Sequence, residues 1–167
     1  MLIFDRHVAD NSTPDFSVSL PYDKRVRGRL RIALDGGKGD AGINVERGEL
    51  LREGSKLGSE TGQILVVHAQ AEQVSVAATD DRLLFARACY HIGNRHAQVQ
   101  IDEQRLVYLH DHVLDEMLAL LGLDVGAQDL PFEPENGAYT GAHAHAHAHA
   151  HDHDHDHDHD SYVQSAG

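Results

Sequence analysis

Residues 74–125 read VSVAATDDRLLFARACYHIGNRHAQVQIDEQRLVYLHDHVLDEMLALLGLDV. Asp80-Asp81 and Asp111 each precede a segment whose apolar residues recur at the spacing of one helical face, so the pattern predicts two aspartate-capped helices. Gly93-Asn94 and Gly122 follow the last apolar positions and are typical of left-handed helix C-caps. The two apolar stripes consist of Leu84, Phe85, Ala88, Cys89 and Ile92, and of Val113, Leu114, Met117, Leu118 and Leu121.

Short strands flank and separate these two helices. The runs that predict strands are Val74–Ala78, Gln98–Ile101, Arg105–Leu109 and Leu123–Val125. The resulting order, β-α-β-β-α-β, is that of the ferredoxin-like split βαβ arrangement. We therefore expect an α+β protein in which residues 74–141 form a ferredoxin-like domain.

Residues 1–73 follow a different pattern, because period-two alternation replaces the helical spacing. No helix of useful length is expected before residue 80, and Asp35-Gly-Gly-Lys-Gly-Asp40 predicts a turn. We expect a small all-β domain here. Its predicted strands are Phe16–Leu20, Val26–Leu34, Ile43–Val45, the residues near Leu50–Leu51, and Gln63–Val67.

A row of arginines accompanies the second of these predicted strands. Arg25, Arg27, Arg29 and Arg31 alternate with its apolar residues and would share one face of it. Such a row is usually a solvated face of a sheet, and the alternative is a surface that docks an acidic protein. The sequence leaves both interpretations open.

The composition bounds the class of protein. The chain has 167 residues, 41% of them hydrophobic, and a net charge of −13. That charge excludes proteins that bind nucleic acid or anionic membranes through a basic surface. The single cysteine, Cys89, excludes a disulfide framework and fits a reducing compartment. No apolar run is long enough for a membrane span, and the first residues do not resemble a signal peptide, so we expect a cytoplasmic protein.

Histidine is the most unusual component of residues 142–167, since it alternates with Ala over residues 142–151 and with Asp over residues 151–160. This composition predicts a disordered tail. Along an extended chain, histidines two residues apart point to the same side and can hold one ion of Ni²⁺, Cu²⁺, Zn²⁺ or Co²⁺. Binding needs neutral imidazole, so it should fade as the pH falls through about 6.5. The predicted tail ligands are His143, His145, His147, His149, His151, His153, His155, His157 and His159.

Three further histidines are candidate ligands. His96 follows the first predicted helix in an exposed turn. His110 and His112 flank Asp111 at a strand-to-helix junction, where the positive end of the helix dipole disfavours imidazolium. Ordinary surface, core or interface positions account for the remaining histidines, His7, His68 and His91.

Three segments stand out when the chain is considered as a whole. They are Ala88-Cys-Tyr-His-Ile-Gly-Asn-Arg-His96, Tyr108-Leu-His-Asp-His-Val-Leu-Asp-Glu-Met-Leu118 and Leu130-Pro-Phe-Glu-Pro134. Together with the His-rich C-terminus, they resemble the UreE-type urease accessory proteins, which are nickel metallochaperones. The resemblance is strong over the second domain, compositional over the tail, and limited to β character and length over residues 1–73.

The resemblance implies a homodimer that delivers Ni²⁺ during assembly of the urease metallocentre and has no enzyme activity. Its partners would be the urease apoprotein and the urease accessory proteins, including the maturation GTPase, and residues 1–73 would dock on partners. His96 would meet its dimer mate at the principal nickel site, and His110 with His112 would form a secondary site in each protomer.

The resemblance also implies that tail histidines complete the principal site, His143 or His145 being closest to the folded domain. One departure from the family pattern is visible. In this chain Ala97-Gln98 follows the Gly-Asn-Arg-His string, where the family commonly has a Pro-containing continuation. The difference bears on the expected conformation of the loop and not on His96 as the ligand.

Two other functions compete with this one. A cytosolic nickel or zinc storage protein would act through the tail alone, without a dedicated recipient. A metallohydrolase would use His96, His110 and His112 with Asp111, but the sequence contains neither paired carboxylates in a plausible cleft nor a nucleophile–base motif.

Overall fold

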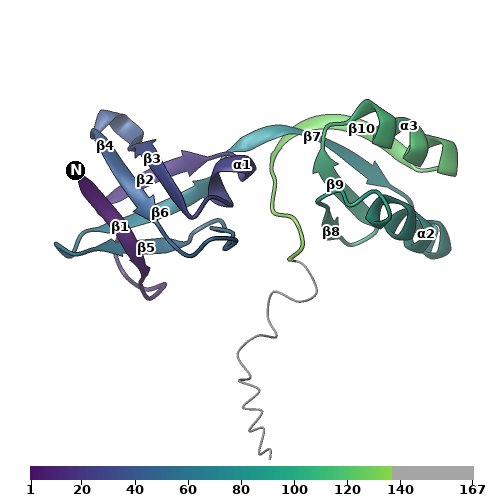
Figure 1. The fold of residues 1–167 in the computed structure, drawn as a ribbon. Coiled ribbons are helices and arrows are strands. Elements are labelled where there is room, and N and C mark those ends of the chain that lie inside the picture. The colour runs from purple at the N-terminus through teal and green to yellow at the C-terminus, as the bar shows by residue number, and fades with distance from the viewer. Residues whose placement is uncertain (137–167) are drawn as a thin grey trace, which may run out of the picture. The chain divides into compact units, whose positions relative to one another are not determined.

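The structure, a computed structural model, describes residues 1–136. These residues contain two β-sheets together with helices, which confirms the expected α+β class (Figure 1). Among them, no helix is long and apolar enough to cross a membrane. The predicted tail, residues 142–167, lies outside the described residues, and the predicted domain boundaries after residues 73 and 141 stay predictions.

The first sheet has six strands in the order β2-β6-β5-β1-β4-β3. β1 pairs with β4, and β2 with β6, in parallel, and the other pairs are antiparallel. Alternate residues of the strands point inward, so that Phe4, Ile43 and Leu65 are completely or almost completely buried. The elements are β1 (Leu2–His7), β2 (Phe16–Leu20), α1 (Tyr22–Arg25), β3 (Arg29–Ala33), the 3₁₀ turn η1 (Asp35–Gly37), β4 (Asp40–Asn44), β5 (Lys56–Ser59) and β6 (Ile64–Ala69).

Part of the strand prediction for residues 1–73 is wrong. The residues near Leu50–Leu51 are not a strand, although Leu51 is completely buried, because Leu51 fills the core from a loop. The strand lies at Lys56–Ser59 instead, where small residues obscure the alternation. The strand Leu2–His7 was also not expected, yet it pairs with both β4 and β5.

Arg25 overturns the predicted row of four arginines. It ends α1, and β3 begins only at Arg29, so neither Arg25 nor Arg27 lies on the strand that carries Arg29 and Arg31. Its side chain is completely buried and forms an ion pair with Glu133. Nε donates to the Leu20 carbonyl over 3.1 Å, Nη1 to the Leu51 carbonyl over 3.1 Å, and Nη2 to the carbonyl of Phe132. A buried guanidinium needs such partners, and long-range neighbours supply them.

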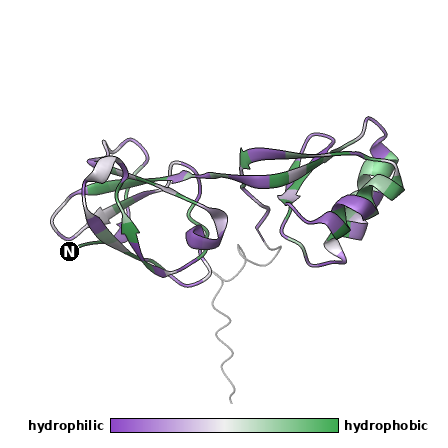
Figure 2. Cartoon of the chain, turned by 90° about the horizontal axis from the view of Figure 1, so that it is seen from above, coloured by the Kyte–Doolittle hydropathy of each residue, from purple (hydrophilic) through white to green (hydrophobic). Residues whose placement is uncertain are grey.

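The second sheet has four antiparallel strands in the order β10-β7-β9-β8. Figure 1 shows both helices, α2 and α3, lying beside this sheet. Figure 2 shows hydrophobic residues, in green, along the strands and in these helices. The elements occur in the predicted order β-α-β-β-α-β and are β7 (Ala71–Ala78), α2 (Arg82–Gly93), β8 (Gln100–Asp102), β9 (Arg105–Leu109), α3 (His112–Leu121) and β10 (Asp124–Pro131).

The helix starts are as predicted. The Asp81 carboxylate accepts hydrogen bonds from the amides of Leu83 and Leu84 at the start of α2. The Asp111 carboxylate accepts from those of Val113 and Leu114 at the start of α3. Each aspartate thereby satisfies two of the backbone N–H groups that a helix start leaves unpaired.

Three details of this part differ from the prediction. β7 and β10 are longer than expected, since they pair along their whole length from Asp124 with Ala78 to Pro131 with Ala71. Val113 is 54% exposed and does not belong to the apolar core stripe of α3. Gly122 ends α3 with a φ of 108° as expected, but Asn94 after α2 is right-handed.

The segment that follows β10 is tied to α1, to the loop before β5 and to residues at the start of β8. The Glu133 carboxylate pairs with Arg52 at 3.1 Å in addition to Arg25. The Glu133 amide donates to the Gln100 side chain over 3.0 Å, and the Glu135 amide donates to the Val99 carbonyl over 2.8 Å. The chain therefore leaves the described part of the protein from a position held beside the loop between α2 and β8.

Candidate metal-binding sites

His96 lies in a tight turn directly after α2. Its amide donates to the Gly93 carbonyl over 3.0 Å, and the Arg95 amide donates to the Ile92 carbonyl over 3.0 Å. His96 itself takes the left-handed conformation, with a φ of 53°, which was predicted for Gly93-Asn94. Few residues other than glycine adopt this conformation, and histidine is among those enriched there. The turn leaves the imidazole exposed, as predicted.

An uncovered apolar surface lies close to this turn. A hollow of about 420 Å³ is lined by His91 of α2, by Arg95 just after this helix, and by Met117, Leu120 and other residues of α3. Exposed apolar side chains occur on the same two helices, Tyr90 at 67%, Val113 at 54% and Leu120 at 82%. Apolar groups gathered at one place on a surface are typical of a contact with another protein.

His110 is held by a network of partly buried hydrogen bonds just after the end of β9. Its Nδ1 lies 2.9 Å from the hydroxyl of Ser75 and 3.2 Å from a carboxylate oxygen of Asp115. The other oxygen of Asp115 accepts a hydrogen bond from the Tyr108 hydroxyl over 2.7 Å. Ser75 and Tyr108 are completely or almost completely buried and face each other as register partners on β7 and β9.

This network orients the His110 ring. When Nδ1 carries the proton and donates it to Asp115 or Ser75, the lone pair of Nε2 is free for a metal ion. Burial and the hydrogen bond to Asp115 raise the pKa of the Tyr108 hydroxyl, so Tyr108 stays protonated and donates at neutral pH.

His112 begins α3 and is exposed, with Asp111 between it and His110. The amides of Leu114 and Val113 hold the pKa of the Asp111 carboxyl below its ordinary value. Asp111 is therefore ionised at neutral pH, but its hydrogen bonds serve the helix start. His110 and His112 thus lie at one strand-to-helix junction, as the sequence predicted. Both remain candidate ligands.

The other candidate ligands do not gather with these. Within residues 1–136, no group of three or more His, Cys, Asp or Glu side chains is arranged to hold a metal ion. His7 lies 2.6 Å from Glu49, and His68 lies 2.7 Å from Glu53, each at an exposed position of the first sheet's loops and strands. The nine predicted tail ligands lie outside the described residues.

The structure locates two further residues of α2, His91 and Cys89, that the sequence had assigned to ordinary positions. His91 is exposed and stacks edge-on against Tyr90 with ring centroids 5.4 Å apart, so it does not belong to the core. Cys89 packs against the core beneath α2, and burial raises the pKa of its thiol. A raised pKa disfavours the thiolate form that metals bind, in agreement with the assignment of Cys89 to the apolar stripe.

Sequence reasoning missed Ser75, Tyr108 and Asp115 as partners of His110. Alternation along the strands could have placed Ser75 and Tyr108 on one face of the sheet, but their pairing depends on register between β7 and β9. Asp115 was overlooked because an acidic residue in the first helical turn has an ordinary explanation in the helix dipole.

Comparison with known proteins identifies the family. Residues 4–70 match the family description "UreE urease accessory protein, N-terminal domain", and residues 72–159 match "UreE urease accessory protein, C-terminal domain". The urease accessory protein UreE of Alkalilimnicola ehrlichii is 46% identical over 141 residues, which cover 84% of this chain and 86% of the relative.

Two further relatives carry the same name. The protein of Pseudomonas putida strain W619 is 48% identical over 143 residues, 85% of this chain and 88% of the relative. That of Vibrio parahaemolyticus is 48% identical over 125 residues, 75% of this chain and 78% of the relative. The chain therefore belongs to the UreE urease accessory protein family.

Proposed function

We propose that this protein is a cytoplasmic nickel metallochaperone that takes part in urease maturation and delivers Ni²⁺ to the urease metallocentre. The observation that carries the proposal is His96, an exposed imidazole held by the backbone at the end of α2 beside an uncovered apolar surface. The ion is cargo, and no turnover of another substrate is expected. Imidazole suits Ni²⁺, although Zn²⁺, Cu²⁺ and Co²⁺ compete for the same ligands.

The homodimer of the proposal is formed through the helical face of a ferredoxin-like domain. Tyr90, Val113 and Leu120 would become buried against their symmetry mates, which gives these exposed side chains an apolar environment. A two-fold axis near α2 would bring two His96 rings together and form a preorganised pair of ligands. One exposed histidine alone binds a metal ion weakly.

Tail histidines supply the remaining ligands in this proposal. The hydrogen bond from Glu135 to Val99 fixes the point from which the chain continues, close in sequence to His96. An extended chain spans at most roughly 3.3–3.6 Å per residue, so the segment from Glu135 to His143 can bridge up to about 25–30 Å. His143 and His145 are therefore within the reach that the proposal needs.

The secondary site consists of His110 and His112, with His110 as the oriented ligand. We expect Asp115→Asn to lower Ni²⁺ affinity at this site by about tenfold, because partners of a ligating histidine contribute on that scale. The ¹⁵N chemical shifts of the His110 ring in the metal-free protein report its tautomer directly. They should show Nδ1–H in the wild type and a mixed or reversed tautomer in the variant.

Glu116→Gln is the matched control for this experiment, because Glu116 neighbours Asp115 on α3, is exposed, and loses the same charge. An equal loss of affinity in both variants, with the His110 tautomer unchanged, would show that only net charge matters. The orienting role of Asp115 would then be rejected.

Delivery follows from ligands that can be withdrawn one at a time. A partner, the urease apoprotein or an accessory protein such as the maturation GTPase, replaces the tail ligands while the His96 pair still holds the ion. Free Ni²⁺ is then never released. A flexible ligand set is suited to such exchange, whereas a rigid closed site is not.

Deletion of residues 142–167 tests this order of events. We expect the truncated protein to transfer Ni²⁺ to apo-urease several-fold more slowly than the full-length chain, yet to retain transfer through His96. The measurement is the initial rate of urease activation at equal loaded nickel. An unchanged rate would contradict the part assigned to the tail.

The competing function is storage of nickel or zinc by the tail, which its nine histidines favour. The same deletion discriminates between the two functions. A storage protein would lose its capacity with the tail, and the remaining chain would neither bind Ni²⁺ tightly nor accelerate urease activation above the level of free ion.

A further inference from the structure

Residues 132–135 cross the second sheet from one edge to the other, and we name them the strap. They follow the edge strand β10, and the amide of Glu135 donates to the carbonyl of Val99, which directly precedes the opposite edge strand β8. Neighbouring strands lie about 4.8 Å apart, so the intervals of the order β10-β7-β9-β8 amount to about 14 Å. An extended chain covers roughly the same distance in about four residues. The strap therefore has little spare length.

The start of the strap is anchored on the face of the sheet that the helices leave open. Phe132 is completely buried in a cluster with Val74, Val76 and Val107. The alternate residues of β7 and β9 pack with α2 and α3 on the other face. Phe132 therefore gives the strap an apolar core of its own.

Pro134 and Glu133 stiffen the middle of the strap. Proline fixes its own φ and keeps the preceding residue, Glu133, extended. Pro134 is buried, and its carbonyl accepts a hydrogen bond from Arg52 over 2.8 Å. The Glu133 carboxylate forms ion pairs with Arg25 and Arg52. A short segment with so many fixed points has little conformational freedom, so it defines the place from which the chain continues at Asn136.

One side chain of β8 also holds the strap. Gln100 is the register partner of Val107, so it lies on the same face as the cluster of Phe132. Its Oε1 accepts a hydrogen bond from the Glu133 amide over 3.0 Å, and its Nε2 lies 3.3 Å from each carboxylate oxygen of Asp102. Arg105 donates to Asp102 from Nε over 3.1 Å and from Nη2 over 2.5 Å. A chain of hydrogen bonds thus leads from β9 through β8 to the strap.

The charge of Asp102 decides which end of the Gln100 amide faces the strap. The hydrogen bond from Arg105 holds the pKa of the Asp102 carboxyl below its ordinary value, so Asp102 is ionised at neutral pH and only accepts hydrogen bonds. Only the NH₂ end of Gln100 can donate to it, and the carbonyl end must point to the Glu133 amide. Both ends of Gln100 therefore have an assigned partner.

The residues that hold the strap belong to the same short stretch of chain as His96. Val99 and Gln100 follow the turn of His96 closely. The tail histidines, beginning with His143, come after the strap in the sequence. A ligand on a short tether meets its site at an effective concentration of about millimolar, which falls steeply as the tether lengthens. The starting point of the tether therefore affects how readily a tail histidine binds an ion held by His96.

We propose that Gln100 is a positioning residue for the tail. Through the strap it starts the tether beside His96, so that tail histidines and His96 act as one site. This inference rests on the proposed function, but it adds no ligand and concerns the contact that joins two groups of ligands. Without the contacts of Gln100 and Glu135, the tether begins nearer to β10, at the far edge of the sheet. Its starting point then moves by up to about 14 Å, and residues of the strap lengthen it.

A strap with a purely structural role predicts a different result. It would cover the open face of the sheet and stabilise the fold, but the position of the tail would not depend on Gln100. The two roles can be separated, because the burial of Phe132 and the ion pairs of the Glu133 carboxylate do not involve the Gln100 side chain.

The release variant combines Gln100→Leu with Glu135→Pro. The first substitution removes the acceptor of the Glu133 amide at similar side-chain size, and the second removes the amide that donates to Val99. The matched control combines Gln128→Leu with Glu135→Gln. Gln128 is an exposed glutamine of β10, and Glu135→Gln removes the same charge but keeps the amide.

The first measurement uses the metal-free, full-length protein. A nitroxide at position 140, attached through Thr140→Cys in a Cys89→Ala background, broadens the NMR signals of amides that it approaches. With the native strap we expect strong broadening of residues 94–99. The release variant should lose most of this broadening, and the control should keep it. The amide spectra also verify the fold of each variant, and Gln100→Leu alone replaces the release variant if the latter does not fold.

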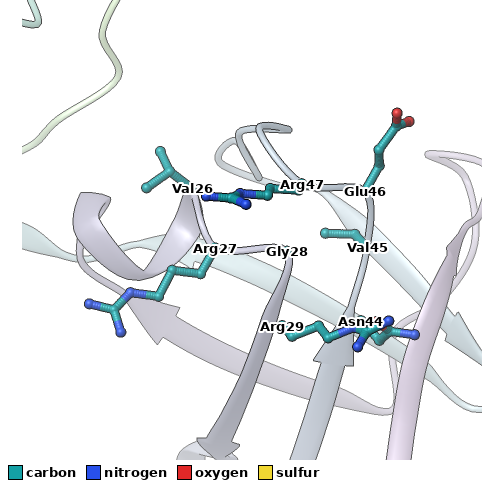
Figure 3. A pocket seen from close by; sticks show the side chains of 8 residues that line it. All are labelled: Val26, Arg27, Gly28, Arg29, Asn44, Val45, Glu46 and Arg47. Atoms are coloured by element: carbon teal, nitrogen blue, oxygen red, sulfur yellow. Dashed lines mark hydrogen bonds between the residues drawn. The ribbon is translucent and has the colours of Figure 1, made fainter.

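The strap can also be loosened from the loop between β4 and β5. Arg52→Gln removes the donor to the Pro134 carbonyl and one ion pair of Glu133, so it should reduce the broadening in part. Arg47→Gln is its control and should leave the broadening unchanged. Arg47 belongs to the same loop, is exposed, and lines the hollow shown in Figure 3.

Nickel titration calorimetry then tests the consequence for metal binding. The release variant should weaken the tight site of the full-length chain by about three- to tenfold, through the lower effective concentration of the tail. The same substitutions in a chain that ends at Gly141 should leave the affinity unchanged, because that chain lacks the tail histidines. The broadening experiment needs no metal, so a failure of the strap and a failure of the nickel function are distinguishable.

Three outcomes would overturn the proposal. Unchanged broadening in the release variant would show that these contacts do not place the tail. Equal loss of broadening in the release variant and its control would reduce the effect to changes of surface charge and polarity. Equal weakening of nickel binding with and without the tail would assign the effect to a disturbed turn at His96.

Discussion

Replacing His96 should remove the tight nickel site of this protein while leaving the histidine tail intact. Nickel titration calorimetry near neutral pH on four proteins resolves the effect: the full-length chain, a truncation that ends at Gly141, and the His96 variant of each. We expect the truncation to bind about half an ion per chain, because one site is shared across a two-fold axis. In the variant, affinity at this site should fall by more than about a hundredfold, beyond the cost of changes around a ligand.

The choice of substitution follows from the backbone. His96 has a φ of 53°, which alanine adopts at a cost and asparagine tolerates. His96→Asn therefore removes the imidazole with the least disturbance of the turn, and His96→Ala serves as the comparison. Equal effects of both on nickel binding, with unchanged thermal unfolding, would assign the loss to the ligand.

His7→Asn is the matched control, because His7 is an exposed histidine on β1, outside the helices that carry the proposed interface. It should leave the stoichiometry and the affinity unchanged. If the truncated chain bound no nickel, and His96→Asn left the full-length titration unchanged, binding would reside in the tail alone. The storage function would then replace delivery.

Replacing Arg25 should cause the largest loss of stability among single substitutions in residues 1–136. Arg25→Met keeps an unbranched stem but removes the guanidinium, so the carboxylate of Glu133 loses its buried partner and keeps the partly exposed Arg52. It also removes the hydrogen bonds to three buried carbonyl groups, which belong to Leu20, Leu51 and Phe132. Loss of one member of a buried ion pair costs about 3–5 kcal/mol of unfolding free energy.

Urea unfolding followed by circular dichroism measures this loss. Arg27→Met is the control, because Arg27 is close in sequence but exposed, and its pair with Asp23 is exposed as well. Such a pair contributes about 0–1 kcal/mol. Arg25→Met combined with Glu133→Gln should recover part of the stability, since the carboxylate that lost its buried partner is then also removed. If Arg25→Met lowered the free energy of unfolding by less than about 1 kcal/mol, the buried contacts of Arg25 would not be a main source of stability.

The contacts of Arg25 and Glu133 also link the stability of the fold to the position of the segment that follows β10. Glu133 and Glu135 hold the chain after β10 to Arg25, Arg52 and Val99. A variant that releases Glu133 should therefore let the segment that leads to the tail move away from the loop of His96. Urea unfolding and nickel titration on the same Arg25 variant report the two effects separately.

The sequence by itself determined the elements whose causes are local. The caps at Asp81 and Asp111 and the left-handed end at Gly122 rest on hydrogen bonds and φ preferences within a few residues. The order of strands and helices after residue 70 follows from periodicity that a single segment displays. The motif around His96, His110 and His112 was sufficient to identify the family.

The tertiary structure alone decided the features that join distant segments. Arg25 lies in a row of alternating arginines in the sequence, yet it is buried because Phe132 and Glu133 supply its partners from far along the chain. The orientation of His110 depends on the register of β7 with β9. Periodicity reports which face of a segment is apolar, but which residues meet across the sheet depends on pairing between segments, and no single segment contains that information.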